Sequence, residues 1–133
     1  MADTMQFDLV APERMVHSAS ATAVTIPAAE GDMTAMPGHA PLIATLRPGV
    51  VTVMTDGKSE EFVVTGGFAE VSATAAALLA EEAMPKSEVT ADFLNEKIAH
   101  AEKLVGGAEP GPQAALLGQQ LNDFMGLKSR LGL

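Results

Sequence analysis

Alternating apolar and polar residues predict a strand-rich front half of the chain. In residues 5–10, Phe7 and Leu9 fall on one face and mostly polar residues on the other, which is the period-2 pattern of a half-buried strand. Similar runs predict further short strands at residues 21–26, 50–54, 61–65, 68–72 and 76–80. Short strands that recur at regular spacing and are joined by turns are typical of an antiparallel sandwich or barrel.

Glycine and proline mark the corners between these strands. Asp56-Gly57 separates two β-rich runs and predicts a tight hairpin, because glycine adopts positive φ at low cost. Gly66-Gly67 predicts the next corner of the sheet. We expect loops at residues 28–32 and 37–41, where glycine and proline cluster.

The composition changes near Pro85, from Val, Ile and Thr runs to Ala, Leu, Glu and Lys. This change predicts a β domain at residues 1–85 and a helical domain at residues 86–133. Thr90 is a suitable N-cap for a first helix, whose apolar stripe is Leu94, Ile98, Ala101 and Val105. After a Gly/Pro-rich break, a second stripe follows at Leu117, Leu121, Phe124, Lys128 and Leu131. Two helices joined by a short loop are typical of an αα-hairpin.

The charge balance narrows the choice of partners. The chain has 8 Lys and Arg against 17 Asp and Glu, a formal net charge of −9. Negative charge of this size disfavours nucleic acid and anionic lipid surfaces. It is concentrated in residues 1–85, with 3 basic and 11 acidic side chains, whereas residues 86–133 have 5 and 6. The absence of Cys excludes disulfides, thiolate metal sites and Cys nucleophiles.

The sequence contains no recognisable catalytic constellation. The three histidines, His17, His39 and His100, lack the spacing of zinc ligands. Motifs for a nucleophile elbow or a phosphate-binding glycine loop are missing. The neighbouring carboxylates of Glu60-Glu61 and Glu81-Glu82 point to opposite faces of a strand and form no dyad. We therefore expect no catalytic residue, no metal site and no cofactor.

Nothing in the sequence predicts insertion into a membrane. The most apolar stretch, residues 73–80, is far shorter than the ~20 residues of a membrane-spanning helix. Residues 1–6 lack the basic and apolar regions of a secretory signal. We expect the chain to stay in the compartment where it is made.

One segment, residues 28–42, combines loop residues with an acid, a histidine and two methionines, Met33 and Met36, that we expect to be exposed. A turn-rich crossover between sheets and an interface loop both fit this composition.

Three motifs in and after this segment are specific in order and spacing. They are Ile26-Pro27-x-x-x-Gly31-Asp32-x-x-x-Met36-Pro37-Gly38-His39-Ala40-Pro41-Leu42, Leu46-x-Pro48-Gly49-Val50, and Gly66-Gly67-Phe68-x-Glu70-Val71. Leu79-Ala80-x-x-Ala83 follows them. With the strand-rich front and the helical tail, these motifs resemble the epsilon subunit of F-type ATP synthases of bacterial type over nearly the whole chain.

The resemblance implies a ten-stranded β-sandwich followed by a helical hairpin. It also implies a non-catalytic rotor subunit of the central stalk that links the gamma subunit to the c ring and couples proton flow to ATP synthesis. Such a subunit is peripheral on the cytoplasmic face of the bacterial inner membrane. The resemblance also implies that its C-terminal hairpin can contact delta-type, alpha and beta subunits.

The resemblance assigns two groups of contact residues. The ring-facing loop maps onto Glu30, Gly31, Asp32, Met33 and Thr34. The gamma contact maps onto His39, Pro41 and Leu42.

A second hypothesis is a regulatory nucleotide-sensing subunit whose C-terminal hairpin inhibits ATP hydrolysis. Many family members bind ATP through an Ile/Leu-Asp-x-x-Arg-Ala motif, but here Thr90 stands in place of the Asp and Phe93 in place of the Arg. The triphosphate then lacks a bidentate cation, which favours weak or no ATP binding. Few cations on the last helix likewise favour weak inhibition. A third hypothesis, a free-standing enzyme or small-ligand binder, is disfavoured by the lack of convergent polar residues.

Overall fold

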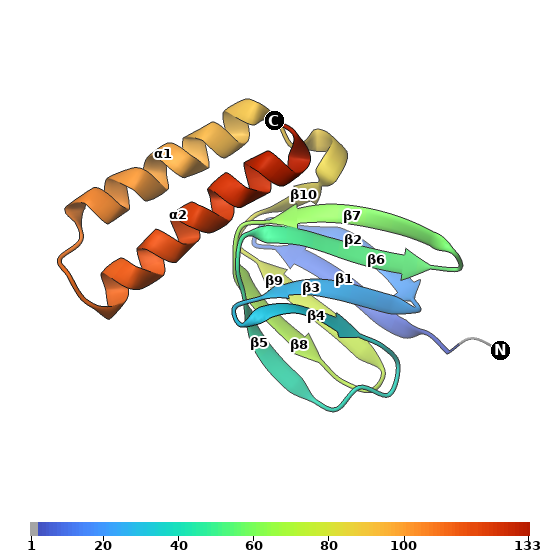
Figure 1. Ribbon diagram of the computed structural model, residues 1–133. Coiled ribbons are helices and arrows are strands. Elements are labelled where there is room, and N and C mark those ends of the chain that lie inside the picture. The colour runs from blue at the N-terminus through green and yellow to red at the C-terminus, as the bar shows by residue number, and fades with distance from the viewer. Residues whose placement is uncertain (1–2) are drawn as a thin grey trace. The chain divides into compact units, whose positions relative to one another are not determined.

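The computed structural model describes residues 3–133. The chain divides into two compact units, one that ends at Lys86 and one that spans Ser87–Leu133. The first unit consists of strands and the second of helices (Figure 1). The predicted β-sandwich with a following helix-loop-helix hairpin is therefore confirmed.

The described part of the first unit has ten strands. They are β1 (Met5–Ala11), β2 (Arg14–Ala21), β3 (Ala23–Ala28), β4 (Gly31–Ala35), β5 (Leu42–Leu46), β6 (Gly49–Thr55), β7 (Lys58–Val64), β8 (Gly67–Val71), β9 (Ala75–Ala80) and β10 (Ala83–Pro85).

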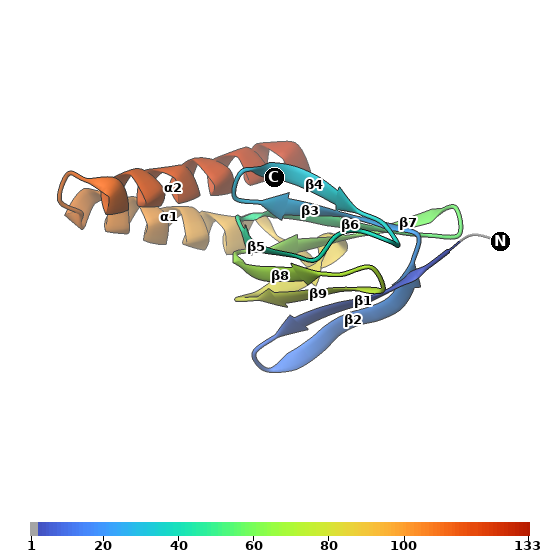
Figure 2. The ribbon, with the colours of Figure 1, turned by 90° about the horizontal axis from the view of Figure 1, so that it is seen from below.

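These strands form one folded-over sheet. Their order is β10-β7-β6-β3-β5-β8-β9-β1-β2, and β4, which is not part of this path, pairs with β3. The sheet bends at β5, so that β4, β3, β6, β7 and β10 make one layer and β5, β8, β9, β1 and β2 make the other (Figure 2). One pair differs from the antiparallel expectation, because β1 runs parallel to β9. Parallel neighbours cannot be joined by a tight turn, and these two strands come from opposite ends of the β unit.

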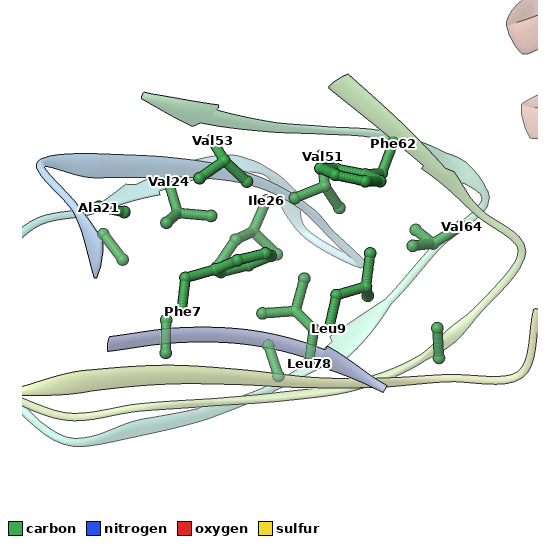
Figure 3. Packing of buried hydrophobic residues seen from close by; sticks show 14 of the residues in the cluster. Phe7, Leu9, Ala21, Val24, Ile26, Val51, Val53, Phe62, Val64 and Leu78 are labelled. Carbon is green, nitrogen blue, oxygen red and sulfur yellow. The ribbon is translucent and has the colours of Figure 1, made fainter. Parts of the chain in front are cut away.

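The core fills the space between the two layers. Alternate residues of each strand point inward, as the period-2 pattern predicts, and the inner side chains of β1 are completely buried (Figure 3). The labelled residues of this cluster are Phe7, Leu9, Ala21, Val24, Ile26, Val51, Val53, Phe62, Val64 and Leu78. Because the inward residues alternate with the others along each strand, the same alternation determines which residues face outward.

The predicted hairpin at Asp56-Gly57 is confirmed. Thr55 pairs with Lys58 across it, and φ is +52° at Asp56 and +82° at Gly57. Two consecutive residues with positive φ are what the favoured two-residue hairpin turn requires.

The predicted loop at residues 28–32 is wrong in its extent. Ala28 pairs directly with Gly31, so the turn is limited to Ala29 and Glu30, and β4 begins at Gly31. The strands β2, β4, β5 and β10 were not predicted. Serine, threonine and small residues weaken the apolar alternation in the first three, and β10 has only three residues. The segment at residues 37–41 lies outside the strands, as expected.

A short 3₁₀ helix, η1 (Lys86–Glu88), spans the boundary between the two units, and the second unit contains two α-helices, α1 (Ala91–Gly107) and α2 (Pro112–Leu131). The predicted N-cap is confirmed, since the Thr90 hydroxyl accepts a hydrogen bond of 3.1 Å from the Phe93 amide. Neither helix of the described chain is long and apolar enough to cross a membrane.

The apolar stripes of the helices are confirmed in part. Leu94 and Ala101 are buried in α1, and Phe124 is buried in α2. Leu127, which the predicted stripe omits in favour of Lys128, is also buried. Both positions follow Phe124 by about one helical turn, and the leucine is the one that gains from burial.

Candidate docking surfaces

The β3–β4 turn carries the residues predicted to face the c ring. The side chains of Asp32 and Thr34 are exposed on β4, and Glu30 is exposed in the turn. Met33 points the other way: it is half-buried and packs against the core, so its predicted exposure is wrong. The alternation of a β-strand explains this, because Met33 lies between two outward-facing residues.

An ion pair fixes the base of this turn. Arg47 donates from Nη2 to Oδ1 of Asp32 at 3.2 Å, and both side chains are partly exposed. The backbone adds two bonds, from the Arg47 amide to the Pro27 carbonyl at 2.9 Å and from the Ala29 amide to the Thr45 carbonyl at 2.8 Å. The turn is therefore anchored to β5 on one side of the fold.

A surface cavity of about 620 Å³ lies beside the turn. It is lined by residues 28–33 and 42–45, and so brings Leu42 next to the predicted ring-facing residues. His39 and Pro41 do not line it. His39 is half-buried, with Nδ1 at 2.6 Å from the Ala40 carbonyl oxygen, and Pro41 is exposed.

The structure also reveals an apolar surface that the sequence reasoning missed. On the outer face of the layer β5-β8-β9-β1-β2, register places four apolar residues in one row: Phe68, Leu79, Val10 and Met15. Phe68 is 58% exposed, Leu79 55% and Met15 56%. Ile43, 73% exposed, lies on the same outer face but pairs with Glu70, so it stands in the neighbouring row. We call Phe68, Leu79, Val10 and Met15 the outer apolar row.

A polar row runs beside the apolar one. Glu70, Ala77, Asp8 and Ser18 follow one another across the same strands by register. The Asp8 carboxylate accepts a hydrogen bond of 2.7 Å from the Ser18 hydroxyl and one of 3.0 Å from the Gln6 amide. These two donors, Ser18 first, lower the pKa of Asp8 below its ordinary value.

The start of α1 holds the residues that replace the nucleotide motif. The Thr90 hydroxyl is engaged in capping the helix. The Lys97 ammonium lies 5.4 Å from the centroid of the Phe93 ring, a cation–π contact. No arginine occurs between Ala91 and Gly107.

The helical unit has a cavity of about 820 Å³ at the opposite end of α1, lined in part by His100, Lys103 and Leu117. It is separated from Thr90 by most of the helix. Among residues 3–133, no group of three His, Asp or Glu side chains is arranged to hold a metal ion.

Comparison with known families gives a match over the whole β unit. Residues 4–86 match the model of the ATP synthase delta/epsilon chain β-sandwich domain. The ATP synthase epsilon chain of Rhodobacter capsulatus is 47% identical over 133 residues, covering 100% of both chains. That of Paracoccus denitrificans (strain Pd 1222) is 48% identical over 139 residues, covering 100% of this chain and 94% of the relative.

Solved structures share the fold at lower identity. A chain of the Euglena gracilis mitochondrial ATP synthase, from a structure of OSCP, F1 and c-ring, superposes with a TM-score of 0.73 at 24% identity, covering 96% of this chain and 81% of that one. A chain of the Tetrahymena thermophila mitochondrial ATP synthase central stalk and c-ring gives a TM-score of 0.68 at 15% identity, covering 96% of each. With the full-length relatives and the matched sandwich domain, the chain belongs to the family of ATP synthase epsilon chains.

Proposed function

We propose that the chain is a central-stalk rotor subunit that binds the gamma subunit and rests on the c ring. In this role it couples proton flow to ATP synthesis and contributes no catalytic group. It is peripheral on the cytoplasmic face of a bacterial inner membrane. The observation that carries the proposal is the outer apolar row on a sandwich whose core is otherwise well enclosed.

The outer apolar row is the surface we assign to the gamma subunit. Large apolar side chains gathered on one face of a folded protein mark an interaction surface, because their exposure to water is unfavourable. Three side chains more than half exposed, Phe68, Leu79 and Met15, lie in register across four strands. Ile43 lies on the same outer face, on the strand that follows the segment with His39 and Pro41. Leu42 pairs with the buried Val71 and therefore faces the other side of β5.

The β3–β4 turn is the part we assign to the c ring. Its two-residue turn and the Arg47–Asp32 ion pair hold it in one conformation, and a rigid loop loses little entropy on docking. Its exposed carboxylates, Glu30 and Asp32, suit polar or basic loops of the ring.

The regulatory alternative receives less support. A nucleotide site at the start of α1 needs polar and cationic groups directed at phosphates, but Thr90 caps the helix and Phe93 supports the Lys97 side chain. The last helix carries only Lys128 and Arg130 as cations. We therefore propose that ATP binds weakly or not at all and that the hairpin inhibits hydrolysis weakly.

Membranes from a strain that lacks the chain test the rotor function. We expect ATP hydrolysis in inverted vesicles to become uncoupled from proton pumping, and pumping to return when the purified chain is added. A Phe68→Ser, Leu79→Ser double variant removes apolar area from the row and should fail to restore coupling. A Lys58→Ser variant, changed at the exposed β6–β7 turn, serves as the control and should restore it. Full coupling without the chain would refute the proposal.

A further inference from the structure

The outer apolar row has a direction and a spacing that restrict what can bind it. Phe68, Leu79, Val10 and Met15 occupy the adjacent strands β8, β9, β1 and β2, so the row runs across the strands rather than along one of them. Adjacent strands lie about 4.8 Å apart, so the row is about 14 Å long.

This spacing fits the side chains of an α-helix. A helix rises 1.5 Å per residue, so a step of about 4.8 Å corresponds to about three residues. Positions i, i+3, i+7 and i+10 lie on one helix face at heights of about 0, 4.5, 10.5 and 15 Å, close to the positions of the four strands. A partner β-strand laid along the row presents side chains on one face every ~6.6 Å, so after one contact its side chains no longer match the ~4.8 Å spacing of the row.

The polar row restricts the charge of the same partner. Asp8 lies two residues along its strand from Val10, and thus about 7 Å to the side of the apolar row. Ser18 and Gln6 hold its carboxylate in place, and Glu70 adds a second carboxylate in the same row. A carboxylate that is fixed before binding favours a positive side chain on the flank of the incoming element.

We propose that the outer apolar row receives a single amphipathic helix that crosses the strands, with apolar residues at i, i+3, i+7 and i+10 and a Lys or Arg on the flank that faces Asp8. The inference deepens the proposed function, since it takes the gamma subunit as the source of this helix. The helix lies nearly perpendicular to β8 and β9, with Phe68 and Met15 at the ends of the contact.

Site-directed cross-linking tests the direction and spacing. The chain has no cysteine, so single variants Phe68→Cys, Leu79→Cys and Met15→Cys each accept one benzophenone maleimide. After irradiation of the complex with the gamma subunit, mass spectrometry identifies the gamma residue attached to each position. We expect all three in one helix, with about three or four residues between the Phe68 and Leu79 products and about ten between the Phe68 and Met15 products. The variant Lys58→Cys is the control and should give no product.

The outcomes separate the two proposals. Products in unconnected segments of gamma, or at intervals of two residues, overturn the crossing helix while leaving the rotor function intact. The same holds if gamma binds the labelled chain but no product forms. If the unmodified chain does not bind gamma, the proposed function itself fails.

A charge variant tests the flank. Asp8→Asn keeps the size of the side chain and its ability to accept from Ser18, but removes the negative charge. We expect the Kd for gamma to rise about tenfold at low salt, with a difference that shrinks as salt increases. Glu102→Gln, an exposed carboxylate on α1, is the matched control and should leave the Kd unchanged. Equal Kd values for Asp8→Asn and the unmodified chain at every salt concentration overturn the cationic flank.

Discussion

Gly67 connects backbone geometry to the docking surface, and its substitution by alanine is a sharp test of the structure. Gly67 opens β8, pairs with Ala80 and precedes Phe68, which pairs with Leu79. Its φ is +129°, and a Cβ atom built on it would lie 2.0 Å from the Leu79 carbonyl oxygen and 2.9 Å from the Ala80 Cα. A side chain there conflicts with the backbone of the neighbouring strand, which cannot move aside by a rotamer change.

The cost of Gly67→Ala has two parts. A non-glycine residue at such a φ costs about 1–3 kcal/mol. Relieving a contact of 2.0 Å requires β8 and β9 to separate by more than an ångström, which weakens the adjacent backbone hydrogen bonds by about 0.5–1.5 kcal/mol each. We expect a total loss of about 3–5 kcal/mol in the free energy of unfolding.

Gly31→Ala is the matched control. Gly31 has a φ of +136°, close to that of Gly67, but a Cβ atom there meets nothing within 4 Å. This variant carries the backbone strain alone, and we expect a loss of about 1–3 kcal/mol.

Urea denaturation measures both variants. The chain has no Trp or Tyr, so the amide NMR signals of β8 and β9 are the suitable probe, and they report on the sandwich separately from the helices. Equal losses for Gly67→Ala and Gly31→Ala would refute the argument, because the interstrand contact would then have no energetic effect.

Four further predictions concern the polar contacts and the helical unit. Replacing Ser18 by alanine should raise the pKa of Asp8, which NMR titration of its carboxyl carbon measures. A carboxyl group whose pKa is lowered by folding stabilises the folded state above its unfolded pKa, and this stabilisation is lost as the pH falls, so the variant should be less stable at neutral pH and its stability should depend less on acid. An unchanged titration would contradict the assigned hydrogen bond. Thr90→Ala should destabilise the first turn of α1 by about 1 kcal/mol, read from faster amide exchange at Phe93, whereas unchanged exchange would show that the cap is dispensable. Calorimetry with Mg-ATP should detect no micromolar binding, and removal of residues 87–133 should raise the ATPase rate of the complex only slightly; a strong effect in either assay would support the nucleotide-sensing alternative.

Local chemistry accounts for the parts of the fold that the sequence predicts well. Asp56 and Gly57 form the two-residue turn of a hairpin, and Thr90 caps the start of α1. Neither feature depends on residues distant in the sequence. The strands β2 and β4 pair with the strand just before them in the chain, but their weak apolar alternation gives little local signal. The strand β5 depends mainly on β8, which is distant in the sequence. Met33 was misplaced for the same reason, since the strand in which it alternates was not foreseen.

The outer apolar row could not be predicted from the sequence, because its residues become neighbours only through the pairing register of the strands. Phe68, Leu79 and Met15 are separate exposed residues along the chain, and single exposed apolar residues are ordinary. The row forms when β9 pairs antiparallel with β8 and parallel with β1, and when a bulge between Leu9 and Val10 brings Met15 opposite Val10. Without that bulge the outward sequence of β2 would shift by one residue and its apolar end would turn inward.

The distribution of charge gives the row its selectivity under the proposed function. The β unit carries almost all of the net charge, with 3 basic against 11 acidic side chains in residues 1–85, and two of those carboxylates, Asp8 and Glu70, border the row. An exposed apolar face invites nonspecific contact with lipid or with other proteins. Carboxylates beside it penalise anionic lipid and acidic surfaces, while a helix that brings a cation gains from the same charges. The carboxylates therefore give the docking face its selectivity: the apolar side chains supply most of the binding energy, and the fixed carboxylates favour an apolar helix that carries a cation over one that does not.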